Sequence, residues 1–230
     1  MVPQITRFRL KRDYWDDGVC LYDKGEVTVK PGVTVLVGCN GSGKSTMLRQ
    51  MREQLEETKS AHLYIRYDKE REQKDMRLAD GKATFEIFAS WVASSEGEQI
   101  VVRLQALAEE VGRLVRNSTN KNLYLLLDGV DSGLSIDNIA DMKTHLLHML
   151  VSRIHEEGRD LFIIATSNTY ELAEGEDCID VVTCQHRRFA SYEEYRDVIL
   201  ESRKKKNGRA EPKTVRPELR VRRPKQKSSS

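Results

Sequence analysis

The feature that most constrains this chain is residues 33–51, VTVLVGCNGSGKSTMLRQM, where a β-branched apolar run breaks into a glycine-rich turn. Gly38, Gly43, Lys44 and Ser45 occupy the fixed positions of the pattern G-x-x-x-x-G-K-[ST]. In such a loop the glycines let the backbone wrap an anion, while backbone N–H groups and a helix N-terminus point positive charge at phosphates. A strand, this loop and a helix in that order therefore predict a nucleotide-binding site.

Individual residues of the loop have separate expected tasks. Lys44 is expected to reach the β and γ phosphates, where it would also act in catalysis, and the Ser45 hydroxyl is expected to hold Mg²⁺. The predicted phosphate-binding residues are Gly38, Asn40, Gly41, Ser42, Gly43, Lys44, Ser45 and Thr46. The pattern alone does not distinguish ATP from GTP.

The composition is that of an ordinary globular protein, with 39% hydrophobic and 32% charged residues. No apolar run approaches the ~20 residues that a membrane span needs. The first residues lack the apolar core of a signal peptide, so we expect a cytoplasmic protein with no membrane contact. The four cysteines form no C-x-x-C pair, which argues against a zinc site and against a disulfide framework.

The C-terminal end differs from the rest of the chain in charge. Residues 203–227 hold twelve lysines and arginines against two glutamates, so this segment carries +10 and the remainder −8 within a total of +2. The segment has few apolar residues and three prolines, and it cannot bury enough surface to fold alone. We therefore expect one nucleotide-binding domain over 1–202 and a basic tail, disordered when free, over 203–230.

Hydrophobic patterning predicts an α/β fold. Residues 5–11 and 26–30 alternate apolar and polar side chains, which indicates an antiparallel N-terminal sheet. Continuous apolar runs at 123–127 and 161–165 are typical of central strands covered on both faces. Strands that alternate with helices imply a mainly parallel sheet. The other predicted elements are strands at 33–37 and 63–67, a charged loop at 68–82, and helices at 45–57, 85–93 and 97–116.

Three further motifs follow the loop in order. Asp128 comes directly after the strand at 123–127, where a phosphate-loop ATPase places its Mg²⁺-coordinating carboxylate, the Walker B position. SSEGEQ at 94–99 opens the helix before that strand, and DSGLSID follows at 131–137. Together these motifs resemble the ABC-type ATPases, in which a Ser-x-Gly-[Gly/Glu]-Gln signature begins a helix and a Ser-[Ala/Gly]-Leu-Asp loop follows the Walker B strand.

This resemblance covers about residues 5–185 and has structural and functional implications. It implies a P-loop NTPase fold with a mixed sheet and an antiparallel N-terminal β-subdomain, and it names ATP as the ligand. In that family two subunits pair head to tail, and the signature of one clamps ATP held by the phosphate loop of the other. The residues so assigned are Ser95, Gly97 and Glu98 for the signature, and Ser45, Asp128 and Gln73 for Mg²⁺.

Two positions depart from the family pattern. Gly129 stands where the family has a glutamate that polarises the attacking water, so hydrolysis should be slower by the ~10²–10⁴ that general-base catalysis supplies. Asp131 can substitute as the base, Glu98 can act across the dimer, or hydrolysis is vestigial; we favour Asp131, although a turn cap explains it as well. Ser167 replaces the usual switch histidine and can bond the γ-phosphate, although a strand-end turn explains it equally.

The family resemblance leaves more than one function open. About fifty residues separate the phosphate loop from the signature, too few for the helical insert of a transporter subunit or the coiled coil of an SMC-type protein. The chain thus resembles small soluble ABC ATPases allied to RecF and SMC heads, often called AAA-family ATP-binding proteins. One hypothesis is an ATP-dependent homodimer in DNA metabolism or repair, with nucleic acid bound by the basic segment 203–227. The other is a nucleotide-gated module that controls a protein effector such as a nuclease, with little turnover.

Two smaller questions stay open at this point. The basic segment can also be a solubilising extension that binds no ligand. Tyr22 lies about where transporter-type members stack an aromatic ring on adenine, yet packing in the core explains a lone tyrosine better.

Overall fold

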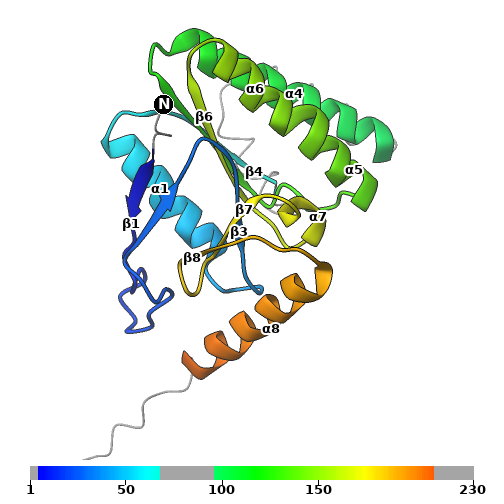
Figure 1. Cartoon of the computed structure of the whole chain (residues 1–230). Coiled ribbons are helices and arrows are strands. Elements are labelled where there is room, and N and C mark those ends of the chain that lie inside the picture. Colours follow the sequence, from blue (N-terminus) through cyan, green and yellow to red (C-terminus); the bar gives the residue numbers. More distant parts are fainter. Residues whose placement is uncertain (1–4, 68–95, 210–230) are drawn as a thin grey trace, which may run out of the picture.

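The computed structural model describes residues 5–67 and 96–209 (Figure 1). The centre of this part is a six-stranded sheet in the order β4-β5-β6-β3-β7-β8. Its strands are β3 (Gly32–Val37), β4 (Ala61–Arg66), β5 (Asn122–Asp128), β6 (Asp160–Thr166), β7 (Asp177–Asp180) and β8 (Gln185–Arg187). All neighbouring pairs are parallel except β7 and β8, which run antiparallel. The predicted mainly parallel α/β sheet is confirmed.

Two hydrophobic cores lie on opposite faces of this sheet. In β5, Leu123, Leu125 and Leu127 enter one core, whereas Tyr124 and Leu126 enter the other. This alternation follows from the two-residue period of a strand, and β6 shows the same alternation. Both faces are covered, which explains why the sequences of these strands are continuously apolar.

Helices from the middle of the chain cover the first face. They are α4 (Glu96–Asn117), α5 (Ile136–Asp141), the π-helical segment η1 (Met142–His148), α6 (Met149–Glu156) and α7 (Tyr170–Ala173). Figure 1 shows α4, α5 and α6 side by side on this face. In α4, which corresponds to the helix predicted at 97–116, Leu107 and Val111 are buried against the sheet.

The second face is covered by the first part of the chain. Here α1 (Lys44–Glu57) packs through Met47, Leu48 and Met51. Beside it, β1 (Thr6–Arg9) and β2 (Glu26–Val29) form a separate antiparallel two-stranded sheet. The predicted antiparallel N-terminal sheet is therefore confirmed.

The last described helix, α8 (Tyr192–Arg209), lies at the end of the molecule where β3 gives way to the phosphate loop (Figure 1). The domain boundary predicted at residue 202 falls inside this helix. Residues 203–209 are thus helical, which differs from the predicted disordered tail, because contacts with the phosphate loop hold this end of the helix. The predicted loop at 68–82, the helix at 85–93 and residues 210–230 lie outside the described residues.

Within residues 5–67 and 96–209, no helix combines the length and the apolar character that crossing a bilayer requires.

Candidate nucleotide-binding site

The carboxyl ends of four parallel strands meet at one edge of the sheet. Arg66 pairs with Asp128 across β4 and β5, and Leu36 pairs with Thr166 across β3 and β6. The phosphate loop follows β3 at this same edge. In parallel α/β sheets this is the edge at which ligands bind, so the sheet brings the predicted site residues together.

The conformation of the phosphate loop requires glycine at two of its fixed positions. Gly38 has φ +151° and Gly43 has φ +101°, values that side-chain-bearing residues rarely adopt. A Cβ on Gly43 would approach the Tyr22 ring to 3.2 Å. Tyr22 is fully buried and donates its hydroxyl to the carbonyl oxygen of Gly43 at 3.1 Å. Tyr22 therefore packs against the phosphate loop from the protein interior. Its burial supports a role in core packing rather than stacking on adenine.

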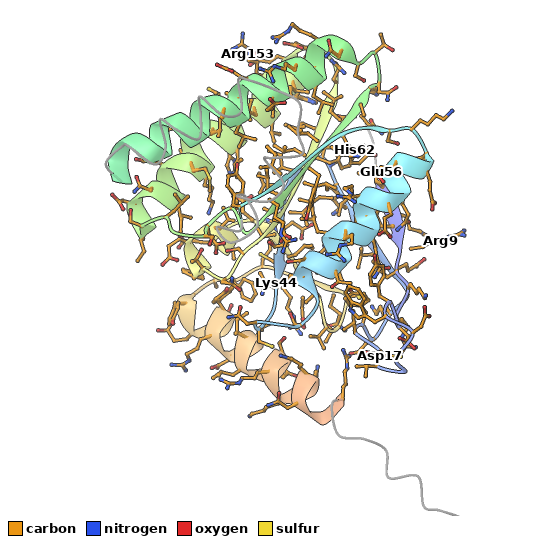
Figure 2. The ribbon with its side chains drawn as sticks, turned by 180° about the vertical axis from the view of Figure 1, so that it is seen from behind. Arg9, Asp17, Lys44, Glu56, His62 and Arg153 are labelled. Carbon is orange, nitrogen blue, oxygen red and sulfur yellow. The ribbon has the colours of Figure 1, made fainter. Side chains whose placement is uncertain are left out.

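Lys44 begins α1 and is almost fully buried (Figure 2). Its ammonium group donates to the carbonyl oxygens of Gly38 at 2.7 Å and Cys39 at 3.4 Å. Burial lowers the pKa of Lys44 below its ordinary value of 10.5. The neighbouring Ser42 hydroxyl is buried with no hydrogen-bond partner in the described structure. Buried polar atoms are normally paired, so a loop with such an atom fits an anionic ligand.

The carboxylate of Asp128 is the centre of the hydrogen-bond network at the strand ends. Its Oδ1 accepts hydrogen bonds from the Ser45 hydroxyl and the Thr166 hydroxyl, both at 2.8 Å. Thr166 is itself positioned by the backbone N–H of Gly129 at 2.7 Å. The Tyr64 hydroxyl donates to Oδ2 at 3.3 Å, and burial, with the nearby carboxylate, raises the pKa of Tyr64. Asp128 is thus buried and held in one orientation from two neighbouring strands.

The donor set formed by Ser45 and Asp128 fits Mg²⁺. Their oxygens lie 2.8 Å apart, and hydroxyl and carboxylate oxygens are ligands that Mg²⁺ prefers. The Nε of Arg66 is 3.8 Å from Asp128 Oδ2, so a cationic side chain also reaches this carboxylate. Gln73, the third predicted ligand, lies outside the described residues.

These groups surround a cavity of about 370 Å³, within the range of small-molecule sites. Its walls combine the phosphate loop, the strand ends and the N-terminal segment: Asn40, Gly41, Gly43, Lys44, Ser45, Thr46, Arg66, Tyr67, Asp128, Gly129, Ser132, Thr166, Asn168, Trp15 and Leu21. Trp15 is 55% exposed, and Arg49 lies over its ring at 5.6 Å. Sequence reasoning did not find Trp15 or Arg66, since neither belongs to a motif.

The two other predicted catalytic residues, Asp131 and Ser167, are bonded to each other. Asp131 Oδ2 accepts hydrogen bonds from the Ser167 hydroxyl at 2.9 Å and from the backbone N–H of Asn168 at 2.7 Å. Both side chains are buried, and Ser167 also bonds to the turn at Thr169. The pair joins the loop after β5 to the loop after β6. A catalytic role for either residue remains a prediction.

Gly129 adopts a left-handed backbone conformation, with φ +70°. A Cβ built there would meet no atom within 4 Å, so the position has space for a side chain. The strain of a side chain in this conformation is roughly 1–2 kcal/mol. Backbone conformation, rather than crowding, is therefore what favours glycine at this position.

The signature motif is described only in part. The helix α4 begins at Glu96, inside the SSEGEQ string, where the sequence predicts a helix start. Ser95 lies outside the described residues, and positions 97 and 98 (Gly97 and Glu98) are described for the backbone alone. Their contact with nucleotide stays a prediction.

The phosphate loop, its buried lysine and the Walker B carboxylate at the carboxyl edge of a parallel sheet define a P-loop nucleotide-binding protein. Residues 28–180 match the family described as an ATPase domain predominantly from Archaea. The match spans most of the chain, and the chain belongs to this family of ATP-binding ATPases.

Two other comparisons complete this result. No curated protein matches the chain. Among solved structures, the chain is similar to the crystal structure of a nucleotide-free ATP-binding cassette from an ABC transporter. The identity is 13% and the TM-score 0.46, and the alignment covers 86% of this chain and 96% of the other.

Proposed function

We propose that this protein is an ATP-gated switch that pairs head to tail with a second copy, hydrolyses ATP slowly and acts on nucleic acid in DNA metabolism or repair. The observation that carries the proposal is the contrast inside one site. Lys44, Ser45 and Asp128 converge on one cavity, whereas the residue after Asp128 is Gly129, which has no side chain to orient water. One chain thus provides groups suited to bind ATP and Mg²⁺. It has no catalytic base at the position after Asp128, where ABC-type ATPases have a glutamate.

Each binding group has a task that its geometry supports. The Lys44 ammonium, already bonded to loop carbonyls, would turn to phosphate oxygens of ATP, and Ser45 and Asp128 would hold Mg²⁺. Bound there, Mg²⁺ would neutralise charge on the phosphates. Thr166 would keep Asp128 in its orientation, and Trp15 at the cavity rim would contact the adenine ring of ATP.

The dimer and the nucleic acid enter through the family resemblance and the charge of the chain. The signature residues Ser95, Gly97 and Glu98 of one copy would close on ATP in the other, so ATP binding would shift the population toward the closed dimer. The cations of 203–227 would attract the phosphates of nucleic acid.

A single set of measurements tests this proposal. Purified protein is mixed with ATP and Mg²⁺, and phosphate release and the dimer fraction are followed together, beside a Lys44→Ala variant. The proposal expects ATP-dependent dimers with slow phosphate release in the wild type and neither in Lys44→Ala. A wild-type protein that binds ATP and stays monomeric at all concentrations would refute the clamp.

A second candidate is a nucleotide-gated module that recruits a protein effector with little turnover. The hydrogen bonds of Asp131 favour it, because a carboxylate that fastens two loops together is poorly placed to accept a proton from water. In the same measurements, this candidate predicts ATP-dependent dimers without phosphate release above that of Lys44→Ala.

A further inference from the structure

A second hollow lies beside the phosphate loop and adjoins the nucleotide cavity. It runs between α8 and the loop, has a volume of about 590 Å³, and is called the α8 groove below. Its walls include Asn40 and Asn168 from the body of the protein, and Tyr192, Arg196, Arg203 and Lys206 from α8. Asn40 and Asn168 also line the nucleotide cavity, so the two hollows share a wall. Figure 2 shows α8 beneath the end of α1 that carries Lys44.

The helix that forms the groove is fixed to the phosphate loop. The buried Ser202 hydroxyl accepts a hydrogen bond from the backbone N–H of Cys39 at 3.2 Å. One turn later, Lys206 donates to the carbonyl oxygen of Asn40 at 2.9 Å. At the end of the helix, Arg209 bonds to Leu21 and Asp23. The groove is therefore a built feature with a defined shape.

The chemistry of the groove suits an anion that carries a flat ring. The described residues that line it include three cations and no carboxylate. Tyr192 is 53% exposed and Leu200 is 48% exposed, so apolar surface is available beside the cations. Of the carboxylates of α8, Glu201 pairs with Lys205 and Glu194 accepts the backbone N–H of Ala190, whereas Asp197 pairs with the groove residue Arg196. Both side chains of that last pair are exposed, and exposed ion pairs contribute little free energy, so Arg196 can exchange Asp197 for a phosphate.

The arrangement of charge along α8 favours a polymer over a single phosphate. The three cations that line the groove, Arg196, Arg203 and Lys206, are spread along the helix rather than gathered at one point. From Arg196 to Lys206 the helix spans about 15 Å at 1.5 Å per residue. A row of cations with exposed aromatic surface is how proteins bind single-stranded nucleic acid, since the cations follow the backbone and bases stack on the rings.

We propose that the α8 groove binds single-stranded nucleic acid, with backbone phosphates on Arg196 and Arg203 and a base against Tyr192. This inference rests on the proposed action on nucleic acid and names the surface that performs it.

The test uses the full-length chain and a fluorescent oligothymidylate of about 20 nucleotides, followed by anisotropy without ATP. Arg203→Ala and Lys204→Ala each remove one charge from the same turn, but only Arg203 lines the groove. Arg203→Ala should weaken binding roughly fivefold or more, and Lys204→Ala less than twofold. Tyr192→Ala should weaken it roughly fivefold or more, and Tyr192→Phe should restore most of the affinity.

Three results would overturn the inference. Equal losses of affinity in Arg203→Ala and Lys204→Ala would indicate non-specific electrostatic attraction rather than binding in the groove. Tighter binding of a duplex of the same length would exclude stacking of a base on Tyr192. Loss of dimers in Arg203→Ala would indicate that a second copy of the chain occupies the groove. A full-length variant with glutamine at the seven basic positions from Lys213 to Lys227 separates the groove from the tail, and it should keep the Arg203 effect. MgATP titration by calorimetry tests the proposed function separately, so either idea can fail alone.

Discussion

Asp128 and Asp131 lie three residues apart at the end of the same strand, and both are buried, yet they serve different parts of the molecule. Asp128 faces the Ser45 hydroxyl and the nucleotide cavity. Asp131 turns to the loop after β6 and holds Ser167 and Asn168. One carboxylate faces the proposed nucleotide site, and the other joins the two loops that frame it. The difference teaches that a carboxylate near the Walker B strand is not a catalytic base by position alone.

The largest expected effect is on the binding side of this comparison. Lys44→Ala should weaken MgATP binding at least about 30-fold, because loss of a buried charge partner typically costs about 2–5 kcal/mol. Calorimetric titration measures the affinity, and circular dichroism checks the fold. Lys121→Ala, an exposed lysine at the opposite end of β5, is the control and should bind normally. An affinity of Lys44→Ala for MgATP within threefold of that of the wild type would show that the phosphate loop does not bind the nucleotide.

The next effect is on the framework side. Asp131→Asn should lower the free energy of unfolding by about 2 kcal/mol, since hydrogen bonds to a charged group contribute about 1.5–3 kcal/mol. Urea denaturation measures this change, with the exposed Asp141→Asn as control. If stability is instead unchanged and phosphate release falls by about 10² or more, Asp131 is the base and the contrast with Asp128 disappears.

A smaller effect tests the backbone at Gly129. Gly129→Ala should lower the free energy of unfolding by about 1 kcal/mol, because a side chain is strained at its positive φ. Gly158→Ala is a matched control, since Gly158 has φ +75° and open space around its Cβ position but lies far from the cavity lining. Equal losses in both variants support strain alone. A loss confined to Gly129→Ala would mean that this position has a constraint of its own.

The smallest effect concerns the rim of the cavity. Trp15→Ala should weaken MgATP binding by about two- to tenfold, the equivalent of the roughly 0.5–1.5 kcal/mol of an aromatic pair. Trp15→Phe retains a ring and should recover most of the affinity. Competition with a fluorescent ATP analogue measures both. If the Trp15→Ala and Trp15→Phe variants bind MgATP with equal affinity, Trp15 does not contact the adenine ring.

The sequence predicts the central elements well and the last third of the fold poorly. Continuous apolar runs predict β5 and β6, and the spacing of glycines and a lysine predicts the phosphate loop, because these patterns are local in the sequence. By contrast, β7 has the sequence DCID, with an aspartate at each end, and no apolar pattern predicts it. The strand exists because it pairs with β3 beneath the loop.

The sequence does not predict α8, for a related reason: residues 192–202 have no predicted element, and residues 203–209 fall in the predicted basic tail. Its sequence has no clear apolar stripe and ends in a run of cations. What keeps it helical is contact with distant residues: Tyr195 is buried in the main core, and Ser202 bonds to Cys39. The hydrogen bond between Ser202 and Cys39 joins residues 163 positions apart, and no window of sequence contains both partners.

The sequence by itself determined where the phosphate loop lies, since the loop needs only glycines for its backbone, Lys44 for charge and a strand before it. It also determined that Asp128 ends a buried strand. Only the tertiary structure decided which groups meet at that edge: Trp15 and Arg66 at the cavity, Asp131 on Ser167, and α8 against the loop. The physical reason is that hydrogen bonds and packing between distant segments depend on strand order and register, which local patterns do not specify.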